Sequence, residues 1–140
     1  MNLYESIKNN LKDNFDENFY IEDAIEDKND IMNFHKIATI DKKTNKEVGH
    51  LYYKEVTDME KAGFVNNLKI RDIVIFVEEP YRHMGIATQM YKYLQNKFKD
   101  DEIYFGNFTP EGKKLVRKIG NITDSRKFGK YTFYQGKINL

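Results

Sequence analysis

The sequence contains no cysteine, and only two of its 140 residues are proline. Without cysteine the chain can form neither a disulfide framework nor a thiolate metal site, and a cysteine nucleophile is excluded. No stretch approaches the roughly 20 apolar residues of a membrane-spanning helix, and the first residues lack the basic and apolar segments of a secretory signal. We therefore expect a cytoplasmic protein with no membrane partner.

Composition places the chain among globular proteins, with 32% charged and 40% hydrophobic residues. We expect one domain spanning residues 1–140. The formal net charge of +1 argues against nucleic-acid binding. The charge is uneven, because the first 30 residues carry nine acids and three bases and the last 50 carry eleven bases and five acids. Either this is solvated surface, or it suits an anionic cofactor near the C-terminal half and a cationic acceptor near the N-terminal half.

The most informative stretch is a predicted strand, turn and helix between Leu68 and Phe98. Residues 69–77 form an apolar, β-branched run, which predicts a strand buried on both faces. Pro80 predicts a turn over Glu78–Tyr81, because proline cannot donate to a ladder. The next residues, from Arg82, predict the opening of an amphipathic helix. Its apolar positions are Ile86, Met90, Leu94 and Phe98.

A glycine turn that leads into a helix N-terminus is suited to binding an anion. The first helical amides have no internal partner and lie at the positive end of the helix dipole. Gly85 would let a ligand approach the backbone closely, and Arg82 adds a positive charge. A dinucleotide fold needs three spaced glycines and a P-loop needs Gly-Lys-Ser/Thr, and neither pattern is present. An ordinary strand-turn-helix unit is the remaining alternative.

The rest of the chain predicts two more helices and six more strands. Helices are expected at Leu3–Asp13 and from Thr109 to Gly120, the second with threonine as N-cap and Pro110 in its first position. The polar residues 57–67 could hold a helical turn. Two hairpins are expected, around residues 41–46 and near Gly129. The remaining predicted strands are 18–26, 32–40, 46–56, 102–108, 122–128 and 130–138.

The segment Arg82-His83-Met84-Gly85-Ile86-Ala87 resembles the acetyl-CoA-binding signature of the GNAT superfamily of N-acetyltransferases. That signature is Arg or Gln, two residues, Gly, one residue, then Gly or Ala. The predicted strand before it and helix after it supply the required context. The resemblance implies an α/β (α+β) fold: a GNAT-like mixed, mostly antiparallel sheet of about seven strands with helices on both faces. The family's usual pair of helices between the first two strands is hard to place here.

The resemblance also implies how acetyl-CoA would be held. Backbone groups of Ile75, Phe76 and Val77 would pair with the pantetheine arm as an added strand does. Arg82 and the backbone amides of the turn and helix start would hold the pyrophosphate, and Asn107 would make a further contact. These amides belong to His83, Met84, Gly85, Ile86, Ala87 and Thr88.

The catalytic residues are less fixed by the resemblance. Asp72 is the leading candidate for the general base, with Glu55, Glu78, Glu79 or a water chain as alternatives. The family's usual asparagine and tyrosine positions are occupied by Thr109 and Val116, so the general acid must come from elsewhere. Tyr134 is chosen for this role, with Tyr104 and Tyr131 as alternatives. The three histidines show no metal-ligand spacing, so no metal is expected.

The sequence therefore predicts an N-acetyltransferase that moves acetyl from acetyl-CoA to a primary amine by direct attack in a ternary complex. The acceptor would be a protein lysine or N-terminus, a polyamine or another small cationic amine. The protein would be a monomer or a homodimer. The alternative is a catalytically inactive GNAT-fold module that binds CoA or a protein.

Overall fold

The computed structural model of the chain describes residues 14–24, 34–56, 68–106 and 109–140. The predicted helix Leu3–Asp13, the connection 57–67 and Asn107 lie outside these residues. Residues 14–18, directly before the first strand, are helical.

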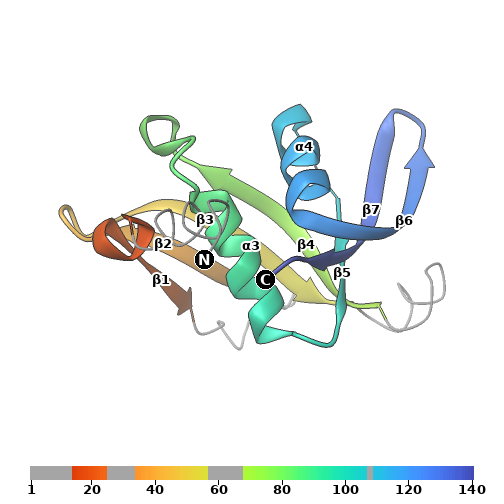
Figure 1. Cartoon of the computed structure of the whole chain (residues 1–140), viewed down its shortest axis with the longest axis horizontal. Coiled ribbons are helices and arrows are strands. Elements are labelled where there is room, and N and C mark those ends of the chain that lie inside the picture. The colour runs from red at the N-terminus through yellow and green to blue at the C-terminus, as the bar shows by residue number, and fades with distance from the viewer. Residues whose placement is uncertain (1–13, 25–33, 57–67, 107–108) are drawn as a thin grey trace, which may run out of the picture.

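Seven strands form one sheet in the order β1-β2-β3-β4-β5-β7-β6 (Figure 1). Only β4 and β5 are parallel neighbours, and every other pair is antiparallel. The mixed, mostly antiparallel sheet of seven strands is therefore confirmed. The strands are β1 Phe19–Ala24, β2 His35–Asp41, β3 Lys46–Glu55, β4 Leu68–Val77, β5 Glu102–Phe105, β6 Gly120–Phe128 and β7 Tyr131–Ile138.

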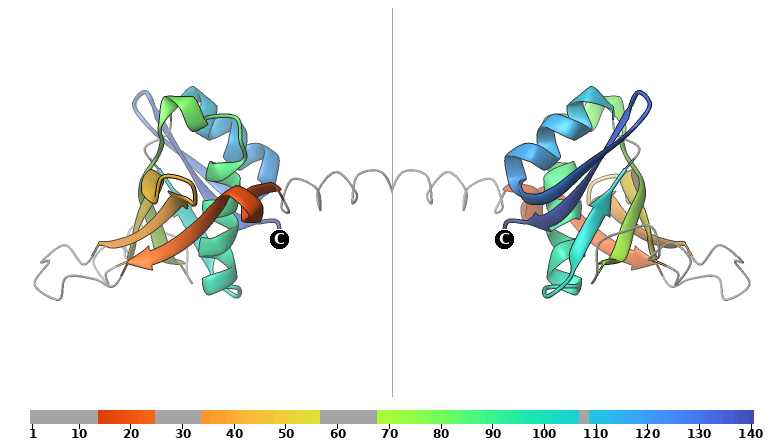
Figure 2. Two further views of the ribbon diagram at one scale, coloured as in Figure 1. Left: turned by 90° about the vertical axis from the view of Figure 1, so that its left-hand side faces the viewer. Right: turned by 90° about the vertical axis from the view of Figure 1, so that its right-hand side faces the viewer.

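Two helices, α3 Ile86–Lys97 and α4 Pro110–Ile119, lie on the same face of the sheet (Figure 2). α3 crosses that face in contact with β2, β3, β4 and β7. α4 begins as predicted, because the Thr109 side chain accepts a hydrogen bond from the Gly112 amide at 3.1 Å. Among the described residues no α-helix covers the opposite face, where helices were also expected.

The main core lies between α3 and the sheet. Alternate residues of each strand point to this face, so β3 contributes Leu51 and Tyr53 and β5 contributes Ile103 and Phe105. α3 contributes Ile86, Met90 and Leu94, all of which are buried. α4 adds the fully buried Val116 to the same cluster. A much smaller cluster on the other face contains Val56 and Tyr104, with Phe133 packed against them.

A polar contact ties the C-terminal end of α3 to β1. Lys97 Nζ lies 2.6 Å from Asp23 Oδ2 and 3.1 Å from the hydroxyl oxygen of Tyr53. Burial alone would lower the pKa of Lys97, but hydrogen bonds to Asp23 and Tyr53 raise it strongly. Lys97 is therefore charged at neutral pH, and the contact fixes α3 across the sheet.

The prediction that residues 69–77 are buried on both faces is wrong for one face. Val74 is 41% exposed and Phe76 is 45% exposed, whereas Ile75 and Val77 pack against the main core. The apolar run is typical of a doubly covered strand, but only the α3 face of β4 is covered by a described helix. The two predicted hairpins, β2–β3 and β6–β7, are confirmed.

Gly136 of β7 provides a test of the sheet order, because a Cβ at this position would lie 2.2 Å from the backbone oxygen of Asn121 in β6. We expect Gly136→Ala to lower the free energy of unfolding by about 2–3 kcal/mol, as overpacking does. Gly129→Asn is the control, because nothing lies within 4 Å of its Cβ position and asparagine tolerates its φ of 63°. Denaturant unfolding of both variants measures the difference, and equal stability would contradict the β6–β7 register.

Candidate active site

The site begins where β4 leaves β5. Leu68, Ile70 and Arg71 pair with Glu102, Ile103 and Tyr104, and within the described residues no pair follows Arg71. β5 continues against β7 on its other side, to Phe105. The carboxyl-terminal half of β4 therefore has an unpaired backbone edge, and the two strands diverge toward their ends (Figure 1).

A bulge in β4 lies at the point of divergence. Tyr52 of β3 pairs with Val74, and the next residue, Tyr53, pairs with Asp72, so Ile73 is an extra residue on β4. Bulges bend a strand and redirect side chains, and they are frequent beside active sites. Here the bulge falls where β4 turns away from β5.

The backbone of β4 presents its groups to alternate sides beyond the bulge. The carbonyl oxygen of Phe76 faces β3, where it lies 3.2 Å from the Cβ position of Gly49. Because successive residues of a strand direct their backbone groups to opposite edges, Ile75 and Val77 present theirs to the unpaired edge. The carbonyl oxygen of Val77 there accepts a hydrogen bond of 3.0 Å from Arg82 Nε.

The turn after β4 has an unusual backbone. The predicted turn at Glu78–Tyr81 is confirmed and contains a short 3₁₀ helix, Glu79–Tyr81. His83 and Gly85 then both have positive φ angles, 66° and 80°. Gly85 is the N-cap of α3, so the helix begins at Ile86 and residues 82–85 belong to the turn, where the sequence predicted the helix to open. Glycine suits this position because it adopts positive φ without a steric penalty.

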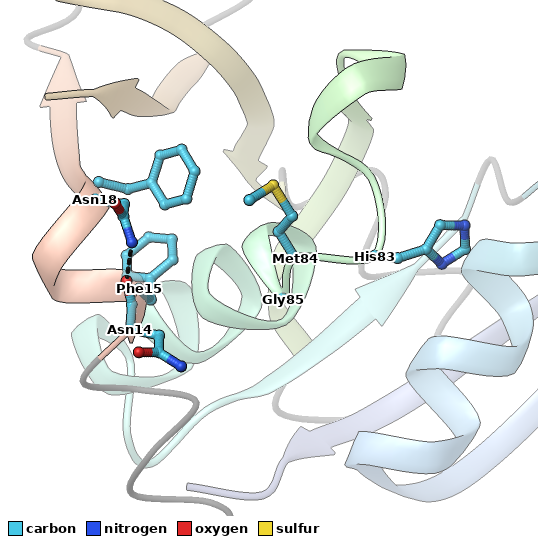
Figure 3. Close-up of a pocket in the computed structure, with 7 residues that line it drawn as sticks. Asn14, Phe15, Asn18, His83, Met84 and Gly85 are labelled. Carbon is cyan, nitrogen blue, oxygen red and sulfur yellow. Dashed lines mark hydrogen bonds between the residues drawn. The ribbon is translucent and has the colours of Figure 1, made fainter. Parts of the chain in front are cut away.

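The space around the helix start is free for a ligand. No side chain caps the first amides of α3, and a Cβ added at Gly85 would have nothing within 4 Å. A pocket of about 370 Å³ adjoins the turn (Figure 3). It is lined by Asn14, Phe15, Asn18, Phe19, His83, Met84 and Gly85. In Figure 3 the ring of His83 points to the other side of the turn from the Met84 side chain.

A side-chain contact fastens this turn to the sheet. The hydroxyl group of Tyr81 donates a hydrogen bond of 2.8 Å to Asp41 Oδ2, and its ring packs against Phe19. Hydrogen bonds from the Lys43 amide and then from Tyr81 lower the pKa of Asp41. The Asp41 carboxylate is therefore charged at neutral pH and holds the glycine turn against the β2–β3 hairpin.

The two predicted catalytic residues lie on different strands. Asp72 is in β4 at the bulge, paired with Tyr53. Tyr134 is in β7, paired with Phe105, and its half-buried ring packs against the main core. The position of Asp72 in β4 suits a site at the split. The position of the Tyr134 ring is explained by its packing against the main core. Both roles stay predictions.

The alternative residues are placed as follows. Glu78 and Glu79 are exposed in the turn, and Glu55 is exposed at the end of β3. Tyr104 is buried in a stack on Phe133, and Tyr131 is exposed in the β6–β7 hairpin. Thr109 is used as a cap, and Val116 is fully buried. Val116, at the family's usual tyrosine position, has no proton to donate to a leaving group.

The sequence analysis gave no role to Lys36, Glu47 and His50, which form a polar group on β2 and β3. This group lies on the face of the sheet that is turned away from α3 and α4, called the helix-free face below. His50 Nδ1 lies 3.3 Å from Glu47 Oε2, and Lys36 Nζ lies 2.5 Å from Glu47 Oε1. The ring of His50 also contacts the rings of Tyr52 and Phe76. The signal available was Glu47 three residues before His50, but their contact depends on the register shift near Ile40 in the β2–β3 hairpin.

The described residues hold neither a metal-binding group nor a membrane-spanning helix. No group of three or more His, Cys, Asp or Glu side chains there could hold a metal ion. No described helix is long and apolar enough to cross a membrane.

Taken together, a mostly antiparallel sheet split after its fourth strand and a glycine turn at the next helix define a class of mixed α/β acyltransferase folds. Comparison with solved structures identifies it. The chain has the fold of the GNAT superfamily of acetyltransferases.

Three solved structures illustrate the likeness. A histone acetyltransferase HPA2 and related acetyltransferase from Corynebacterium glutamicum matches all of this chain and 78% of its own, with 12% identity and a TM-score of 0.55. A GNAT-family acetyltransferase from Staphylococcus aureus matches 75% of this chain and 68% of its own, with 14% identity and a TM-score of 0.53. The ribosomal-protein-S5-alanine acetyltransferase from Vibrio fischeri matches 76% of this chain and 62% of its own, with 13% identity and a TM-score of 0.53.

Such identities establish the fold and not the substrate. No protein-family model matches the chain, and no curated protein sequence matches it.

The contact between Tyr81 and Asp41 gives a pH-dependent prediction. A carboxyl group with a lowered folded-state pKa stabilises the protein above its unfolded pKa, and this contribution is lost as pH falls through the folded pKa. Tyr81→Phe should raise the pKa of Asp41 toward its ordinary 3.8 but not fully, because the Lys43 amide remains. The difference in melting temperature between wild type and variant should be largest at neutral pH and shrink below about pH 4.

Carboxyl NMR titration and thermal melts measure these two quantities. A melting difference that stays the same on acidification would show that Tyr81 acts through packing alone.

Proposed function

We propose that the chain is an N-acetyltransferase that moves acetyl from acetyl-CoA to a primary amine by direct attack in a ternary complex. The observation that carries the proposal is the unpaired edge of β4, which leads directly to the uncapped amides of α3. Acetyl-CoA carries its thioester on an arm that is joined to a pyrophosphate. The β4 edge would take the arm, and the α3 amides that follow it would take the pyrophosphate.

The pantetheine arm would pair with β4 in place of the missing strand. Ile75 and Val77 are the residues whose backbone groups face the open edge, while Phe76 faces β3. An amide at this edge would also polarise the thioester oxygen. Phe76, which was also predicted to pair with the arm through its backbone, would therefore contribute only its exposed side chain.

The pyrophosphate would lie at the N-terminus of α3. The amides of residues 83–88 lie where the helix dipole favours a negative charge, and Gly85 leaves the approach free. The chemistry is then a C–N bond formed as the C–S bond breaks, with CoA thiol and an acetylated amine as products.

A binding module without catalysis is the second candidate. It is favoured by one observation: the family's usual tyrosine position holds Val116, which is fully buried and has no acidic proton, and Thr109 is used as a cap. A module that binds CoA shares cofactor binding with the enzyme and differs from it in turnover, whereas a module that binds only a protein shares neither.

Two measurements test the proposal in sequence. Calorimetry with acetyl-CoA should show binding, and mass spectrometry of an amine panel should show products heavier by one acetyl group. Absence of binding at millimolar acetyl-CoA would overturn the transferase and a CoA-binding module, and would leave only a protein-binding module. Binding without any acetylated amine, across lysine peptides, free N-termini, polyamines and simple alkylamines, would leave the binding module.

Gly85 separates the effect of charge from the effect of backbone strain. Gly85→Glu and Gly85→Gln carry the same penalty for a side chain at a φ of 80°, but only glutamate repels a phosphate. We expect Gly85→Glu to bind acetyl-CoA at least about tenfold more weakly than Gly85→Gln, since ~1.4 kcal/mol is a factor of ten. Calorimetry measures the affinity of both variants for acetyl-CoA, and circular dichroism is the control for folding. Equal affinities of the two variants for acetyl-CoA would show that the pyrophosphate does not bind at this turn.

Arg82 provides the next test, because its guanidinium lies at the end of β4 and 5.9 Å from the ring centroid of Phe76. We expect Arg82→Ala to weaken acetyl-CoA binding by about tenfold to a hundredfold, the range for a charge-assisted contact. Turnover at saturating acetyl-CoA should stay near that of wild type, and Arg82→Lys should recover part of the affinity.

Salt titration is the control for Arg82, because screening should narrow the gap between wild type and Arg82→Ala. Unchanged affinity with turnover abolished would place Arg82 at the reacting atoms and not at the pyrophosphate.

A further inference from the structure

One face of β3 and β4 is turned away from α3 and α4 (Figure 2). Leu51 and Tyr53 of β3 point into the main core, so the alternate residues His50 and Tyr52 point to the helix-free face. On β4 the exposed Val74 and Phe76 lie on that same face. Across the strands His50 pairs with Phe76 and Tyr52 with Val74.

The imidazole of His50 is held in one orientation by Glu47. A carboxylate oxygen can only accept a hydrogen bond, so His50 Nδ1, at 3.3 Å, is the donor, and in the neutral imidazole Nε2 is then the nitrogen with the lone pair. Burial alone would raise the pKa of Glu47, but Lys36 and then His50 lower it, so the carboxylate stays charged at neutral pH. The result is a histidine oriented by a carboxylate, with a free acceptor nitrogen.

The ring of His50 lies against the residue of β4 that stands between the two edge-facing residues. Its ring is 5.1 Å from the Tyr52 ring and 5.6 Å from the Phe76 ring, between centroids. Phe76 is flanked by the two residues whose backbone faces the open edge of β4. The side chain of His50 is 25% exposed, so an acceptor or one water can reach it.

The charged groups around His50 come from three elements. Glu47 of β3 contacts its ring, Lys36 of β2 forms an ion pair with Glu47, and Arg82 of the turn lies against the neighbouring Phe76 ring.

We infer that His50 is the general base of the acetyl transfer, an inference that rests on the proposed function. An ammonium acceptor gives one proton to His50 Nε2, directly or through one water. The freed amine forms the C–N bond to the thioester carbon as the C–S bond breaks. The second nitrogen proton passes to the departing sulfur to give CoA thiol, and the imidazolium releases its proton to solvent.

Two small acceptors distinguish a base from a structural residue. Ethylamine is almost fully protonated at neutral pH, like a lysine side chain, whereas hydroxylamine is largely neutral and already has its lone pair. His50→Gln can still donate to Glu47 but cannot take up a proton. His35→Gln is the matched control, because His35 stacks on Tyr53 at 4.9 Å on the core-facing side of the sheet.

With wild type as reference, His50→Gln should lower kcat/KM for ethylamine by about a hundredfold, the lower range for general-base catalysis. The rate with hydroxylamine should change little, and His35→Gln should resemble wild type with both amines. The wild-type pH profile for ethylamine should level off at alkaline pH, because a base on the enzyme takes the proton from the ammonium. The His50→Gln profile should keep rising toward the pKa of the amine.

The outcomes separate this inference from the proposed function. If wild type binds acetyl-CoA and acetylates an amine, but His50→Gln loses activity equally with both amines or keeps the wild-type pH profile, His50 is not the base. The same holds if the rate with ethylamine is unchanged. If wild type acetylates neither these two amines nor any amine of the panel above, the proposed function fails and the role of His50 fails with it.

Discussion

The hydrogen bonds between β4 and β5 end at Arg71, and the rest of the site depends on that limit. A strand that stayed paired along its whole length would have no backbone groups to offer a ligand. The parallel pair also requires the chain to cross the sheet between β4 and β5, and α3 makes that crossing. The crossover places the N-terminus of α3 at the end of the strand whose edge is unpaired. One connection therefore brings the split and the glycine turn together.

The turn keeps its shape because it is attached at both sides. Tyr81 binds Asp41 in the β2–β3 hairpin, and Arg82 binds the carbonyl oxygen of Val77 at the end of β4. The Glu78 amide donates a further hydrogen bond of 2.9 Å to Val48. Positive φ angles at His83 and Gly85 carry a backbone cost that such surroundings must offset. A turn held in this way can present its amides to an anion without first being ordered.

Local patterns in the sequence predicted most of the elements and the turn. Proline at position 80, glycine at 85 and the Thr109-Pro110 helix start are signals that act within a few residues, and each was confirmed. The insertion of β7 between β5 and β6 and the bulge at Ile73 depend on pairing between distant segments. The contact of His50 with Glu47 depends on a register shift, so no spacing rule could indicate it. The exposure of Phe76 was missed because an apolar run does not say which face will be covered.

β4 has three kinds of neighbour, and the geometry of a strand keeps them apart. Side chains of Ile75 and Val77 pack toward α3, the Phe76 side chain points to the helix-free face beside His50, and one backbone edge pairs with β3. Only the other backbone edge remains, and it faces the split. Because side chains stand perpendicular to the hydrogen-bonding direction, a core-facing substitution at Ile75 changes stability without removing the edge. The same separation lets a strand with apolar side chains, which pack in the core, keep one backbone edge open toward the split.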